Sequence, residues 1–121
     1  MSNICTNIDQ SKKLIELGID VNTADMWYQH IGYSITDGKE KPTYFPMVIR
    51  DNISDDDIPA WSLSALLNLL RHPYLYNTLY NGWRCDSSCK NGEYKLGPSY
   101  TDNPLDAAFE MVCWLKENNK I

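Results

Sequence analysis

The chain has 121 residues, 43% of them hydrophobic, and a formal net charge of -5. This length and composition allow one buried core without a disulfide or metal staple, so we expect a single domain spanning residues 1–121. The acidic balance opposes binding to phosphate backbones, so no nucleic-acid partner is expected. No apolar run approaches the ~20 residues of a membrane-spanning helix, and the first residues lack a signal-peptide pattern. We therefore expect a cytoplasmic protein with no membrane partner.

The first elements in the chain are a helix and a β-hairpin. Asn7, followed three residues later by Gln10, predicts a capping box, and Gly18 a helix end, for a helix at about residues 8–17. Residues 26–35 and 43–49 have a β-like composition, with turn chemistry at Asp37-Gly38 between them. Pro42 and Pro46 remove ladder donors, which indicates that the second strand is irregular or lies at a sheet edge.

A second helix and a second set of strands follow. Ser62 can cap a short helix whose leucines, spaced three and four residues apart, are expected to pack on the sheet. Asn-Gly pairs favour hairpins, and they occur at Asn81-Gly82 and Asn91-Gly92. The second pair, flanked by residues 82–85 and 93–96, marks the hairpin that the sequence favours most. Residues 74–80 are a further candidate strand.

The last element is a helix from Asn103 to Asn119. Asn103 can cap it, Pro104 fits its first position, and one apolar stripe runs from Leu105 to Leu115. A second apolar line of Ala107, Met111 and Trp114 lies on another face. A helix with two apolar faces is either sandwiched in the core or half-buried against a partner or second copy.

These elements predict an α+β fold. We expect an antiparallel sheet of about four strands with three helices, in the order α-ββ-α-ββ-α. The same order occurs in homing-endonuclease-type domains, but their acidic motif is absent here, so the parallel carries no function.

Three groups of residues could carry chemistry. The acidic stretch from Asp51 to Asp57 could supply oxygen ligands, but it lacks the spacing of a calcium loop and equally suits a solvated loop. Cys85 and Cys89 have a zinc-like spacing without a second ligand pair, and free thiols explain them as well. His30 could act as a general base, although a single strand histidine is more often structural. No nucleophile elbow, phosphate loop or dinucleotide motif is present, and no cofactor or metal is expected.

Aromatic residues are the one compositional excess, with eight Tyr and four Trp. Such rings are enriched at protein interfaces, but they also fill the cores of small sheets. If they form an interface, the candidate binding residues are in the β-like stretches and on the last helix: Trp27, Tyr33, Tyr76, Trp83, Met111 and Trp114.

Three segments carry a resemblance. They read NTADM at 22–26, IPAWSLSALL at 58–67 and DNPLDAAFEMVCWL at 102–115. Together they resemble a family of uncharacterised small proteins encoded in prophages and mobile elements of gut bacteria. The resemblance implies a genomic setting and no activity, cofactor or active site.

Two functions remain open at this level. The first is a non-catalytic interaction or accessory protein that binds a protein partner or itself, in which case Trp114→Asp should disrupt the association. The second is a small-ligand binder, metal binder or minor enzyme that uses His30, the stretch from Asp51 to Asp57, or the Cys85/Cys89 pair.

Overall fold

The computed structural model describes residues 4–48 and 56–121. Its elements, in chain order, are α1 (Ile8–Glu16), the 3-10 helix η1 (Val21–Thr23), β1 (Met26–Thr36), β2 (Lys39–Val48), β3 (Ile58–Ala60), α2 (Leu63–Asn68), β4 (Arg71–Thr78), β5 (Gly82–Ser88), β6 (Tyr94–Lys95) and α3 (Pro104–Glu117). The mixed α+β class expected from the sequence is confirmed.

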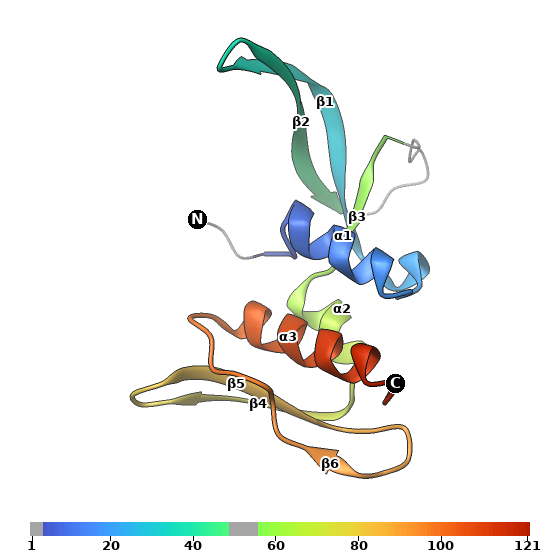
Figure 1. Cartoon of the computed structure of the whole chain (residues 1–121), viewed down its shortest axis with the longest axis vertical. Helices are drawn as coiled ribbons and strands as arrows, with labels where there is room; N and C mark the ends of the chain where they lie inside the picture. Colours follow the sequence, from blue (N-terminus) through green and yellow to red (C-terminus); the bar gives the residue numbers. More distant parts are fainter. Residues whose placement is uncertain (1–3, 49–55) are drawn as a thin grey trace.

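The strands form two antiparallel sheets rather than the single four-stranded sheet that the sequence predicts. The strand order is β2-β1-β3 in the first sheet and β4-β5-β6 in the second. Figure 1 shows the two sheets at opposite ends of the long axis, with the helices between them. Each hairpin gains a short third strand, β3 or β6, that the predicted order lacks. Strands of three and two residues are too short to show a periodic pattern.

The helix ends follow the predicted caps. At α1, the Gln10 N–H donates to Asn7 Oδ1 (2.7 Å) and the Asn7 N–H donates to Gln10 Oε1 (3.0 Å), which completes the capping box. At α3, the Asp106 N–H donates to Asn103 Oδ1 at 2.8 Å. These side chains satisfy amide donors that have no partner within the helix.

The first hairpin turns where predicted, but in the second sheet the longer hairpin is not the one that the sequence favours. Asp37 and Gly38 have φ values of 54° and 74° and join β1 to β2 as expected. The longer hairpin of the second sheet, however, closes at Asn81-Gly82 and pairs β4 with β5. The favoured pair Asn91-Gly92 leads only to the two-residue strand β6. Turn chemistry marks where a chain can reverse, whereas the length of pairing depends on what the strands cover.

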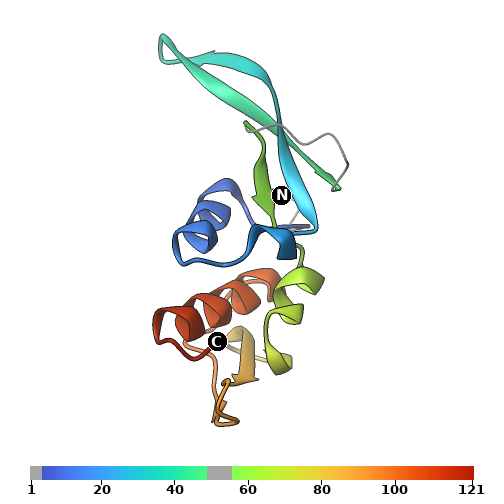
Figure 2. The ribbon, with the colours of Figure 1, turned by 90° about the vertical axis from the view of Figure 1, so that its right-hand side faces the viewer.

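Helix α3 is the centre of the core. Its eight buried residues belong to one apolar cluster with residues of α1, α2 and β5: Leu105, Ala107, Ala108, Phe109, Met111, Val112, Cys113 and Leu115. Figure 2 shows α1 and α2 beside α3, with the second sheet beyond it. In the predicted second apolar face, Ala107 and Met111 are therefore buried within the chain, whereas Trp114 is partly buried against the core. The leucines of α2 pack mainly on α3 instead of on a sheet.

The β1–β2 hairpin, here called the arm, projects from the rest of the molecule. Both views show it extending past β3 at one end of the long axis (Figures 1 and 2). None of the described side chains of β1 and β2 is buried, and none belongs to the core cluster. The arm is thus a two-stranded ribbon that gains little stability from the core.

Trp61 joins the first sheet to the helices. It follows β3 directly, is fully buried, and its indole Nε1–H donates to Thr23 Oγ1 at 2.9 Å. Its backbone N–H donates to Thr6 Oγ1 (3.1 Å) and its carbonyl accepts the Thr6 N–H (2.8 Å). By contrast, the buried Nε1–H of Trp27 has no hydrogen-bond partner among the residues that the structure describes.

The two indoles predict opposite responses to the same substitution. Trp61→Phe removes a satisfied donor and leaves a void at a fully buried site, so it should lower the free energy of unfolding by about 2 kcal/mol. Trp27→Phe removes a donor that has no partner in the described parts of the chain, and it should change that free energy by less than about 1 kcal/mol. Urea denaturation measures both, and equal losses in the two variants would contradict the assignment.

Candidate functional site

The second sheet has one face towards the core and one outer face, and the side chains of β5 point alternately to the two faces. Cys85 is buried in the core cluster, and Trp83 packs partly buried against it. Arg84 and Asp86 therefore lie on the outer side, where four tyrosines surround them. We call this set the tyrosine face: Tyr74, Tyr76, Arg84, Asp86, Tyr94 and Tyr100.

Asp86 is the buried centre of the tyrosine face and is only 4% exposed. Its Oδ1 accepts the Gly97 N–H at 2.8 Å and lies 3.9 Å from Arg84 Nε. The hydroxyls of Tyr76 and Tyr94 donate to it over longer distances of 3.5 Å and 3.4 Å. A buried carboxylate needs such partners, since an unpaired one would be strongly destabilising.

Arg84 is fixed in turn. Its Nε donates to the Gly97 carbonyl at 2.9 Å and its Nη1 to the Tyr100 hydroxyl at 3.1 Å. Its Cζ also lies 5.0 Å from the centre of the Tyr100 ring, a cation–π distance. Gly97 bonds both charged groups: its N–H donates to Asp86 and its carbonyl accepts from Arg84. Only glycine fits here, because a Cβ would lie 2.4 Å from the Cys85 carbonyl oxygen. The glycine lets the two segments approach closely enough for both bonds.

The rings of the tyrosine face remain largely accessible. Tyr74, Tyr94 and Tyr100 are exposed, Tyr76 is half-buried, and the Tyr74 and Tyr76 ring centres lie 5.3 Å apart. Asp86 accepts hydrogen bonds from the hydroxyls of Tyr76 and Tyr94, and Arg84 donates one to the Tyr100 hydroxyl. These three rings are therefore held in position before a partner binds. This arrangement offers a rigid contact surface rather than a reactive centre.

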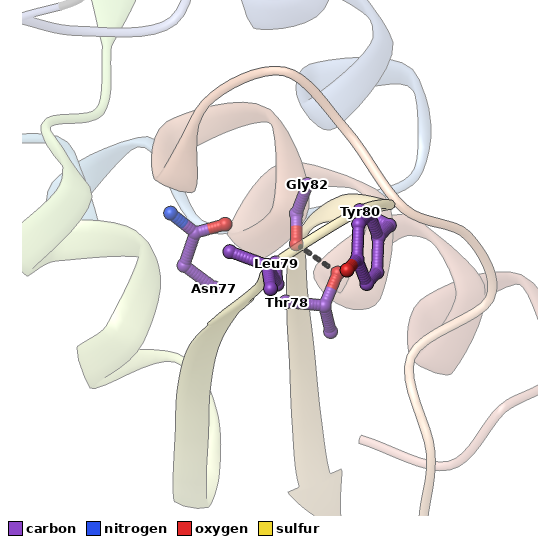
Figure 3. A pocket seen from close by; sticks show the side chains of 5 residues that line it. All are labelled: Asn77, Thr78, Leu79, Tyr80 and Gly82. Carbon is purple, nitrogen blue, oxygen red and sulfur yellow. Dashed lines mark hydrogen bonds between the residues drawn. The ribbon is translucent and has the colours of Figure 1, made fainter.

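A hollow of about 390 Å³ lies beside the β4–β5 turn (Figure 3). It is lined by Asn77, Thr78, Leu79, Tyr80 and Gly82, and Thr78 Oγ1 donates to the Gly82 carbonyl at 2.9 Å. The Asn81 N–H donates back to Thr78 Oγ1 at 3.1 Å. These bonds close the turn, and the lining contains no acid–base pair, so the hollow follows from the turn geometry.

The arm carries a second aromatic group. The β1–β2 register shifts between His30 and Gly32, and this bulge places Tyr33 on the same side as His30. The His30 ring lies 5.0 Å from that of Tyr33 and 5.5 Å from that of Tyr44. Gly32 has a φ of 145°, which disfavours other residues there. His30 is thus packed between tyrosine rings.

The predicted binding residues do not form one site. Tyr76 belongs to the tyrosine face and Tyr33 to the arm, whereas Trp83 and Trp114 are partly buried against the core. Trp27 is half-buried near the base of the arm, and Met111 is inaccessible. Trp114→Asp would therefore act on the core as well as on any partner.

The central pair of the tyrosine face was missed from the sequence. Arg84 and Asp86 are two residues apart in a strand, and this spacing could have placed them on one side of the sheet. Nothing local, however, indicates that Gly97 would complete the site.

The residues of the alternative function are not brought together either. Cys85 and Cys89 are buried thiols; Cys85 lies in β5 and Cys89 directly follows that strand. Figure 1 shows β5 at the opposite end of the long axis from the arm, which carries His30. The His30 backbone N–H donates to Asp57 Oδ1 at 3.1 Å, while residues 51–55 of the acidic stretch lie outside the described residues. Within the described ranges, no group of three or more His, Cys, Asp or Glu side chains could hold a metal ion.

No protein-family model matches this chain, and no curated protein or solved structure matches it either. No helix in the described parts of the chain is long and apolar enough to cross a membrane.

Burial of the thiols predicts a loss of stability at high pH. Burial, with a smaller contribution from Asp86, raises the pKa of Cys85 to about 11, and burial raises the pKa of Cys113 to about 12 despite the opposing charge of Lys13. An unfolded thiol ionises near pH ~8.5. The unfolded chain therefore loses protons first, and stability falls as pH rises from about 9 towards these values.

Cys113→Ala should lessen that fall by up to about 1.4 kcal/mol per pH unit. Urea denaturation at a series of pH values measures the slope. Parallel slopes for the variant and the natural chain would contradict a protonated, buried Cys113.

The charge of Asp86 predicts that two tyrosines of this face ionise at a higher pH than free tyrosine. Burial raises the pKa of Tyr76 and of Tyr94, and the Asp86 carboxylate raises both further. Asp86→Asn keeps an acceptor for the Gly97 N–H but removes the charge, so both pKa values should fall towards ~10. Alkaline titration of tyrosinate absorbance measures this. Asp102→Asn, at an exposed carboxylate, is the matched control and should leave the curve unchanged.

Proposed function

We propose that this protein is a non-catalytic protein-interaction module whose contact surface is the tyrosine face. The observation that carries the proposal is the gathering of accessible tyrosine rings around the fixed Arg84–Asp86 pair. Tyrosine and arginine are the residue types that most often dominate binding energy at protein interfaces.

The rigidity of this surface supports the proposal. Tyr94 and Tyr76 are tethered to Asp86, and Tyr100 to Arg84. Side chains ordered before binding lose less conformational entropy in the complex, which favours affinity. On the opposite face of the sheet, β5 packs against α3 in the core cluster, which holds the strand that carries Arg84 and Asp86 in place.

The chemistry of the face favours a folded protein as partner. The face is broad and aromatic, and its polar atoms are largely engaged with one another. Arg84 is its single cation, on a chain with a net charge of -5, which does not suit a nucleic-acid backbone. An accessory role towards a host or element-encoded protein is part of this proposal.

Site-specific photocrosslinking tests the proposal. A photoreactive phenylalanine analogue at Tyr74 should form adducts with a partner in cells, because this ring is exposed at the tyrosine face. The same analogue at Leu79, an even more exposed residue at the β4–β5 turn, is the matched control and should form none.

The captured protein then allows a quantitative test. Tyr94→Ala should weaken its binding at least tenfold, a hot-spot effect of more than about 1.4 kcal/mol, whereas Leu79→Ala should have no effect. Equal crosslinking at both positions, or unchanged affinity of the Tyr94 variant, would overturn the tyrosine face as the contact surface.

A further inference from the structure

Strand β4 forms one edge of the second sheet. It pairs with β5 on one side, and none of the described strands pairs with its other side. The elements that it contacts most are β5, α3 and α2. All of them lie within residues 56–121, which the structure describes without a gap.

The backbone of Trp83 on β5 shows which groups of β4 face this outer edge. Its N–H donates to the Thr101 carbonyl at 2.7 Å and its carbonyl accepts the Thr101 N–H at 2.8 Å, so both groups point away from β4. Trp83 lies opposite Asn77, and in such an antiparallel pair both residues turn their backbone groups away from each other. The N–H and C=O of Asn77 therefore point to the outer edge of β4, as do those of Leu75, two residues earlier.

This edge lacks the usual protection against pairing. Natural edge strands carry charged residues, prolines or bulges that prevent another strand from adding to them. In β4, Pro73 and the bulge between Arg71 and Tyr74 lie in the first part of the strand. From Tyr74 to Thr78 the strand reads YLYNT, without a charge, and Asn77 is exposed. The part of β4 beyond Pro73 is thus available to another strand.

We propose that the protein bound at the tyrosine face adds a strand of its own to the outer edge of β4. This inference rests on the proposed function and names how the partner is held. Tyr74 and Tyr76 of the tyrosine face alternate along β4 with Leu75 and Asn77, whose backbone groups face the edge. One added strand therefore bonds its main chain to β4 and lays every second side chain beside the two rings.

The edge and the charge of the chain define the chemistry of that strand. Outward N–H and C=O groups that recur every second residue match an extended backbone, whereas a helix already uses its own backbone groups internally. Opposite Tyr76, an aromatic or β-branched residue would pack on the ring. The net charge of -5 favours a neutral or basic partner strand and opposes a second copy, which would bring two acidic chains side by side.

Amide hydrogen exchange, followed by NMR, tests the direction of the backbone groups. In the free chain, the amides of Leu75 and Asn77 should exchange faster than that of Tyr76, whose N–H points to β5. Addition of the protein crosslinked at Tyr74 should slow exchange at Leu75 and Asn77. Slow exchange at both residues in the free chain, or no slowing in the complex, would overturn the proposal.

A proline substitution tests the bond itself. Asn77→Pro removes one outward N–H and no bond to β5, so circular dichroism should show a folded variant. Its affinity for the protein crosslinked at Tyr74 should fall about tenfold or more, because the added strand loses a backbone hydrogen bond. Asn77→Ala, which keeps the N–H, is the matched control and should bind like the natural chain.

The outcomes separate this inference from the proposed function. Equal affinities of the two Asn77 variants would overturn strand addition and leave the tyrosine face as the contact surface. The absence of any adduct at Tyr74 would overturn both. A dimer of the natural chain that Asn77→Pro abolishes and Asn77→Ala keeps, measured by sedimentation equilibrium, would assign the edge to a second copy and overturn the partner strand.

Discussion

The structure depends on the way Trp61 is held between the first sheet and the helices. Its backbone and indole use Thr6 and Thr23, which come from two separate segments before the arm, and its ring fills the core beside α2. The next residue, Ser62, caps α2 and donates its N–H to Asp25 Oδ1 at 2.8 Å. Two adjacent residues thus fix the N-terminal segment, the start of β1 and the start of α2 at once.

This junction makes the two ends of the molecule different in kind. On one side of it, eight residues of α3 are buried in the core cluster, and the second sheet packs against this helix. Above it, the arm leaves the core and keeps only its ladder and surface contacts between rings. Hydrophobic burial supplies most of the stability of a small domain, so the lower part is the firm body. The exposed rings of the arm have no such cover within the described chain.

The tyrosine face shows how that firm body can support a polar centre. A carboxylate as buried as Asp86 is tolerated because Gly97, Arg84 and two tyrosines surround it. Arg84, Tyr76 and Tyr94 lie on paired strands of the second sheet, and Gly97 is held by its two hydrogen bonds to Asp86 and Arg84. The tyrosine rings bonded to Asp86 and Arg84 are thereby held in one orientation at the surface, and a binding site needs such fixed geometry.

The sequence by itself determined the local structure: the caps at Asn7, Ser62 and Asn103, the turn at Asp37-Gly38, and β2 as an edge strand through its prolines. These features act between neighbours a few residues apart, so their signal is readable along the chain. Only the tertiary structure decided the division into two sheets, the burial of Met111 and the meeting of Asp86 with Gly97. Those outcomes depend on which surfaces remain after distant segments pack, and no spacing of nearby residues encodes that choice. The two-faced helix is the clearest case, since its pattern allowed a partner or a core, and the positions of α1, α2 and β5 chose the core.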